Sequence, residues 1–102
     1  MPDDPEYQVD RVPQVDEQVQ ALAKKAVTRS AKQQLVAALK TALEQLRTRP
    51  LDWGDPERRT RKKGGVICHG ICTPIFVRYV VFEAERVVMI LTVDPLPGSG
   101  LE

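Results

Sequence analysis

One cationic side chain, Arg78, stands in the apolar stretch PIFVRYVVF of this 102-residue chain. The planar guanidinium of an arginine can bind a phosphate through two parallel hydrogen bonds, or it can pair with a carboxylate. Glu83 and Asp94 are acids that neighbouring strands could supply for such a pair. Arg78 is therefore a candidate for phosphate binding or catalysis, and a structural ion pair is the alternative.

A second candidate group is a basic run between residues 58 and 63. A surface of this kind can bind the phosphates of a nucleic acid or another macromolecular target, with a strong dependence on salt. It can equally be a solvated loop, and the absence of interleaved aromatic residues favours that interpretation. The residues concerned are Arg58, Arg59, Arg61, Lys62 and Lys63.

Cys68, His69 and Cys72 are residue types that bind zinc. A structural zinc site needs four ligands, and the chain holds two cysteines and one histidine. In a strand, moreover, residues 68 and 72 lie about 13 Å apart on one face, whereas residue 69 points to the other face. We expect buried thiols with no metal and no cofactor. His69 remains a candidate general base, because imidazole exchanges a proton near neutral pH.

Arg78 lies in the first half of a predicted β-hairpin. Residues 75–82 and 87–93 are rich in β-branched and aromatic side chains, and four polar or small residues join them. Alternation along the first strand places four residues on each face: Ile75, Val77, Tyr79 and Val81 on one, and Phe76, Arg78, Val80 and Phe82 on the other. Both faces are mostly apolar, so the sheet needs cover.

Upstream, the pattern predicts a strand over residues 6–12 and a helix over 13–27. A second helix over 30–49 is predicted from Ser30 and Gln33, which have the spacing of a capping box, and from a leucine stripe. The two helices should form an antiparallel hairpin and bury their apolar sides against each other and the sheet.

Residues 50–65 contain prolines, glycines and charges, which are typical of a long irregular connection. Trp53 is expected to pin this connection to the domain. Residues 66–72 should form a further strand, with a bulge or bend at Gly70. The predicted fold class is α+β: an N-terminal strand, a helical hairpin and a three-stranded antiparallel sheet, with the position of the first strand in the sheet left open.

Composition excludes several classes of protein. With 42% hydrophobic and 28% charged residues the chain is not disordered throughout, and its net charge of +1 predicts no partner. No apolar run reaches the roughly 18 residues of a membrane span, and the acidic start lacks the pattern of a signal peptide. We expect a cytoplasmic protein with a single domain over residues 1–100, and Leu101 and Glu102 as a possible vector-derived remnant.

The chain resembles the RelE/ParE superfamily of bacterial toxins from toxin–antitoxin systems, which includes plasmid-stabilisation proteins. The matching features are an opening strand followed by Pro13 and an acidic helix start, the segment RTRPLDWG, the strand PIFVRYVVF and the closing stretch RVVMILTVDPLPGSG. The resemblance implies the same order of elements that periodicity predicts. It covers nearly the whole chain, at the level of pattern.

Functionally, the resemblance implies one of two targets. RelE-like members cleave messenger RNA on the ribosome with basic residues of a concave sheet face, whereas ParE-like members inhibit DNA gyrase, and an antitoxin silences both. Arg78 matches an arginine of the RelE-like proteins, and the basic run matches their lysines and arginines. The closing strand departs from the pattern, because residues 94–97 are DPLP where nucleases have a basic residue and often a later tyrosine or histidine.

Three hypotheses follow. In the first, the chain is a toxin-like protein that binds a macromolecular target, ribosomal or gyrase, and an antitoxin or a second copy covers the exposed sheet. In the second, it is a ribosome-dependent endoribonuclease that uses Arg78, His69 and the basic run. In the third, it is an inactive module that has kept the toxin fold for protein interactions.

Overall fold

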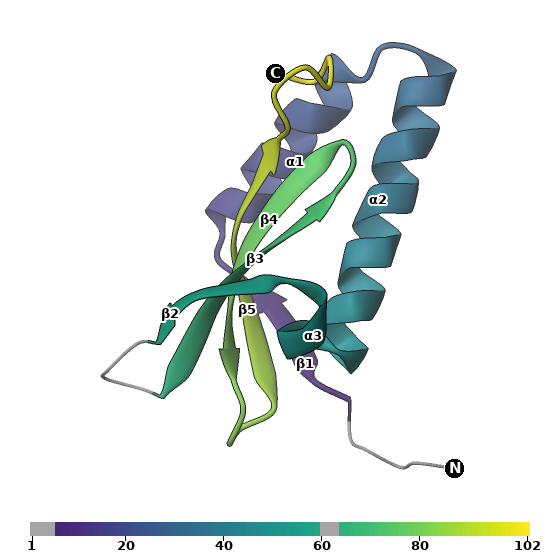
Figure 1. Cartoon of the computed structure of the whole chain (residues 1–102). Helices are drawn as coiled ribbons and strands as arrows, with labels where there is room; N and C mark the ends of the chain where they lie inside the picture. Colours follow the sequence, from purple (N-terminus) through teal and green to yellow (C-terminus); the bar gives the residue numbers. More distant parts are fainter. Residues whose placement is uncertain (1–5, 60–63) are drawn as a thin grey trace.

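The computed structural model describes residues 6–59 and 64–102, in which two long helices pack on one side of a five-stranded sheet (Figure 1). The elements in chain order are β1 (Gln8–Arg11), α1 (Gln14–Lys25), α2 (Arg29–Thr48), α3 (Pro50–Trp53), β2 (Asp55–Arg59), β3 (Gly65–Cys72), β4 (Ile75–Phe82) and β5 (Val87–Pro95). This arrangement confirms the predicted α+β class and the order of its main elements.

The strand order across the sheet is β1-β5-β4-β3-β2. The strands β2 to β5 pair antiparallel, and β1 runs parallel to β5 at the edge, with Val9 opposite Val88. The first strand therefore joins the sheet beside the last one. Tyr7 precedes β1 and its ring receives the guanidinium of Arg86 from the β4–β5 turn at 5.3 Å, a cation–π contact that holds this corner together.

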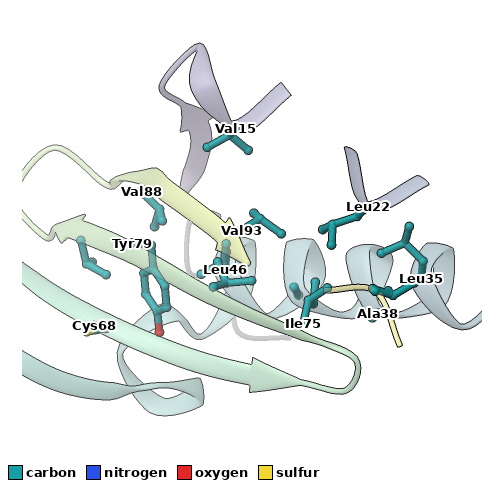
Figure 2. Close-up of a cluster of buried hydrophobic side chains, with 14 of the residues drawn as sticks. Val15, Leu22, Leu35, Ala38, Leu46, Cys68, Ile75, Tyr79, Val88 and Val93 are labelled. Atoms are coloured by element: carbon teal, nitrogen blue, oxygen red, sulfur yellow. The ribbon is translucent and has the colours of Figure 1, made fainter. Parts of the chain in front are cut away.

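The core lies between the sheet and the helices. Ile75, Val77, Tyr79 and Val81 of β4 are at most 2% exposed, as alternation predicts for the face that the helices cover. Figure 2 shows Ile75 and Tyr79 of this strand in one cluster with Val15 and Leu22 from α1 and with Leu35 and Leu46 from α2. Burying an aliphatic side chain of this size contributes about 1.5 to 3 kcal/mol, so this single layer is the main source of stability.

Residues 50–59 are regular structure, which corrects the prediction of an irregular connection. Pro50 opens α3 at a position where its missing N–H is not needed, and β2 then pairs with β3. A register shift between Pro56 and Arg58 accommodates the proline, which is tolerated because β2 is an edge strand. The prolines and charged residues in this segment favoured a loop in the sequence analysis, but the same residue types also occur in edge strands.

Trp53 pins this segment to the sheet, as predicted. Its ring stacks on Tyr79 with 5.9 Å between centroids, and the Tyr79 hydroxyl donates a hydrogen bond to the Pro50 carbonyl. The same ring explains Gly70. A Cβ atom there would lie 2.5 Å from Cζ3 of Trp53. The pairing of β3 with β4 runs through Gly70 without a register shift, so of the predicted bulge or bend no bulge forms in this pairing.

The start of α2 also differs from the prediction. The capping residue is Thr28, whose Oγ1 accepts a hydrogen bond from the Ala31 N–H at 3.0 Å, and not Ser30. Both residues can cap a helix, and the sequence pattern alone chose the later one. The consequence is a helix that begins one residue earlier, at Arg29.

The two long helices pack on the sheet more than on each other. Between them lies an apolar groove of about 580 Å³. The chain end folds back beside α1: Leu101 is buried in the core, and the Lys25 ammonium donates a hydrogen bond to the Glu102 carbonyl at 2.8 Å. None of the helices formed by residues 6–59 and 64–102 is long and apolar enough to cross a membrane.

Candidate functional site

The second face of the sheet, opposite the helices, carries Arg78. Neighbouring side chains on this face are a mixture of apolar groups and a few polar ones, and Ile71 is 58% exposed. We call this surface the open face.

Strand register aligns four polar residues across the open face. Asp55 of β2 pairs with His69 of β3, His69 pairs with Arg78 of β4, and Arg78 pairs with Thr92 of β5. We call these four residues the polar row. Directly opposite residues in a sheet have Cβ atoms about 4.5 to 5.5 Å apart, so neighbouring members of the row can act on one bound group.

His69 is held between two contacts. Its Nε2 lies 4.0 Å from Oδ2 of Asp55, and its ring stacks on Phe76 with 5.4 Å between centroids. The carboxylate attracts the imidazole when the ring is protonated, whereas the phenyl ring fixes the plane of the imidazole. The side chain of His69 is 32% exposed.

Arg78 is exposed on the open face, flanked along β4 by Phe76 and by the buried Val80. Apolar neighbours exclude some water from the guanidinium and so strengthen its attraction for an anion. Arg78 is an exposed residue, and its role in phosphate binding stays a prediction.

A β-bulge adjoins the polar row. Arg78 pairs with Thr92 while Tyr79 pairs with Ile90, so Leu91 is an extra residue in β5 at this point. Bulges of this kind bend a strand and re-aim side chains, and they are common next to functional sites. No pattern in the sequence indicated this bulge.

The basic run is only partly described by the structure. Arg61, Lys62 and Lys63 lie outside the described residues, as do the side chains of Arg58 and Arg59. The backbones of Arg58 and Arg59 belong to β2, where they pair with Ile67 and Val66 of β3. The role of the run in target binding stays a prediction.

The two thiols do not join the polar row. Cys68 is fully buried on the helix-facing side of β3, and burial raises the pKa of the Cys72 thiol above its usual range. In the described part of the chain, no three histidine, cysteine or acidic side chains gather as they would around a metal ion.

Comparison with known proteins gives one informative result. No family model and no curated protein matches the chain. Among solved structures, the archaeal RelE–RelB complex from Pyrococcus horikoshii OT3 contains a chain that superposes with a TM-score of 0.57. The match covers 87% of this chain and 93% of that one, at 17% identity. This chain has a RelE-like fold.

The sequence alone identified part of the polar row. The sequence placed Arg78 on one of two mostly apolar strand faces and named His69 as a possible base. It missed Asp55 and Thr92 as their neighbours, because that conclusion needs the pairing of β2 with β3 and the register shift in β5. Asp55 could have been placed beside His69 only if residues 55–59 had been predicted to form a strand.

Proposed function

We propose that this chain is the toxin of a toxin–antitoxin pair and that it binds a ribosomal or messenger RNA target through the polar row. The observation that carries the proposal is that the exposed residue Arg78 pairs in the sheet register with His69, on a face that neither long helix covers. The RelE-like fold supports it, since that solved relative is a complex of RelE with RelB.

RNA is the target that this geometry favours. A guanidinium binds a phosphate oxygen pair, and the hydroxyl of Thr92, its cross-strand partner, can donate a further hydrogen bond. The stacked rings of His69 and Phe76 present an aromatic surface next to that phosphate site, on which an unpaired base can stack. Phosphate binding and base stacking side by side match a single-stranded nucleic acid better than a folded protein.

Inducible expression in a bacterial host tests this function. We expect the wild-type chain to arrest growth, Arg78→Ala to relieve the arrest, and Arg29→Ala to behave as the wild type. Arg29 is an exposed arginine at the start of α2, away from the open face, and so it is a matched control. Growth without arrest, or arrest by both variants, contradicts the proposal, and arrest with DNA damage redirects it to gyrase.

An antitoxin partner is part of the same proposal. A small protein encoded beside the gene for this chain should relieve the arrest on coexpression and copurify with the chain. Copurification at equal stoichiometry supports the pair. Arrest that no neighbouring gene relieves contradicts it.

The second candidate function is RNA cleavage, which the Asp55–His69–Arg78 arrangement favours. In this scheme the His69 imidazole takes the proton of a 2′-hydroxyl, O2′ attacks the adjacent phosphorus, and the bond to the 5′ oxygen breaks. The leaving oxygen takes a proton from water, and Arg78 stabilises the charge on the pentavalent phosphorus. Asp55, at 4.0 Å, stabilises the protonated imidazole.

Primer extension on RNA from arrested cells separates cleavage from binding. Cleavage predicts discrete 5′ ends with the wild-type chain and their loss with His69→Ala. His69→Gln keeps a similar size without the base, and it should lose the cleavage ends as well. If arrest persists in both variants and the wild type yields no new ends, the chain binds RNA without cutting it.

A further inference from the structure

The groove between α1 and α2 is a second unassigned surface, on the opposite side of the sheet from the polar row. Its volume is about 580 Å³. The floor is formed by Val9, Ile90 and Val93, and α2 contributes Leu39 and Leu43 to one wall. The polar side chains at the groove are Asp10, Arg11, Asp16 and Gln20, which come from β1 and α1. The interior is apolar and the α1 side of the rim is polar.

Apolar surface continues from the groove along α2. Leu43 is 44% exposed at the groove, and Val36 is 50% exposed seven residues, or about 10 Å, earlier on the same side of the helix. Leu39 lies between them and is half-buried. We call Val36, Leu39 and Leu43 the α2 stripe. An elongated stripe beside a groove fits a helix better than a compact small molecule.

Charges show what kind of helix fits. Lys32 and Lys40 are exposed four residues before and after Val36, so they border the α2 stripe on α2 itself. The opposite side of the groove carries the carboxylates of Asp10 and Asp16, and Glu17 is the next residue of α1. One cation, the guanidinium of Arg11, lies among these three acids and pairs with Asp16 at 2.6 Å. A complementary helix has an apolar stripe with a basic border, and α2 of this chain has both.

We infer that the groove is a homodimer interface, in which α2 of a second copy lies in the groove of the first and the reverse contact forms by two-fold symmetry. Such an interface is self-complementary, because the α2 stripe of each copy lines its own groove and also lies in the groove of the partner copy. The lysines that border each inserted helix then face the acidic rim of the partner. The four long helices form one layer, and both open faces remain accessible.

Sedimentation of the full-length chain over a range of concentrations tests this interface. The wild type should reach dimer mass at micromolar concentrations, and Val36→Gln combined with Leu43→Gln should weaken dimerisation about a hundredfold or more. Val27→Gln is the matched control, since Val27 is an 80% exposed valine in the α1–α2 connection, outside the groove, and this variant should dimerise as the wild type does. Circular dichroism confirms that each variant is folded.

Two further variants make the result specific. Lys40→Glu should weaken the dimer, because it sets a carboxylate against the acidic rim, and it changes no apolar contact. Phe82→Gln, on the open face, should leave the dimer intact. A wild type that stays monomeric at 100 micromolar overturns the inference. A dimer lost in Phe82→Gln but kept in the Val36 and Leu43 variant overturns it too.

Discussion

At the scale of residues, burial separates the groups that maintain the fold from those that can bind. Tyr79 and Arg78 are neighbours on β4, yet one is fully buried against Trp53 and the other is exposed on the open face. Alternation along the strand predicted from the sequence that the two side chains lie on opposite faces, but not which face is buried. It could not predict what each side chain meets, because Trp53 and Asp55 arrive through elements that the sequence did not indicate.

Tyr79 should make stability fall at alkaline pH. Burial raises the pKa of its phenol above the usual value of 10.0, so the folded state keeps the proton that the unfolded state releases. Its contribution is therefore complete below pH 10 and declines above it, by about 1.4 kcal/mol per pH unit. Urea unfolding at pH 9, 10 and 11 measures this slope against Tyr79→Phe.

The Phe variant removes the titrating group and keeps the ring, so it serves as the reference. As the pH rises above 10, we expect the free energy of unfolding of the wild type to fall more steeply than that of Tyr79→Phe. Parallel pH profiles for both proteins would show that Tyr79 ionises equally in the folded and unfolded states.

Gly70 should tolerate a methyl group only when Trp53 is absent. Alanine at this position brings a Cβ atom to 2.5 Å from the tryptophan ring, which must move off Tyr79. We expect Gly70→Ala to lower the free energy of unfolding by about 1 to 3 kcal/mol in the wild type. In a Trp53→Ala background the same change should cost much less, and denaturant unfolding of all four proteins measures the coupling. Equal costs in both backgrounds contradict the contact.

At the scale of elements, periodicity predicted the long helices and the three central strands, because each buries one continuous apolar side. Shorter elements escaped it. The helix α3 and the strand β2 are four and five residues long, and both contain a proline and charged residues, which are typical of loops. Tertiary contacts fix these segments: Tyr79 binds the Pro50 carbonyl, and β3 pairs with β2.

The start of α2 gives a prediction at this scale. Thr28→Ala removes the side-chain acceptor for the Ala31 N–H and should lower the free energy of unfolding by about 1 kcal/mol. Ser30→Ala is the matched control and should change it by less than about 0.5 kcal/mol, because exposed Ser30 lies inside the helix. Thermal denaturation ranks the two variants. A larger effect from Ser30→Ala would indicate that Ser30, and not Thr28, caps the helix.

At the scale of the whole molecule, the one-sided packing of helices on the sheet creates two separate surfaces. The open face presents the polar row, and the groove between the helices presents the α2 stripe. The sequence predicted an uncovered sheet face, since two helices cannot cover both sides. It could not predict the groove, because the spacing of two amphipathic helices depends on the width of the sheet below them.

Binding of the purified chain to bacterial ribosomes, measured by co-sedimentation, tests the central claim most directly. We predict that the wild type and Arg29→Ala co-sediment equally and that added salt weakens both. Arg78→Ala should bind at least about tenfold more weakly, and Arg78→Lys should fall between, because an ammonium keeps the charge without the planar fork. Equal binding by the wild type and Arg78→Ala, or no binding by the wild type, contradicts an RNA-binding role for the polar row.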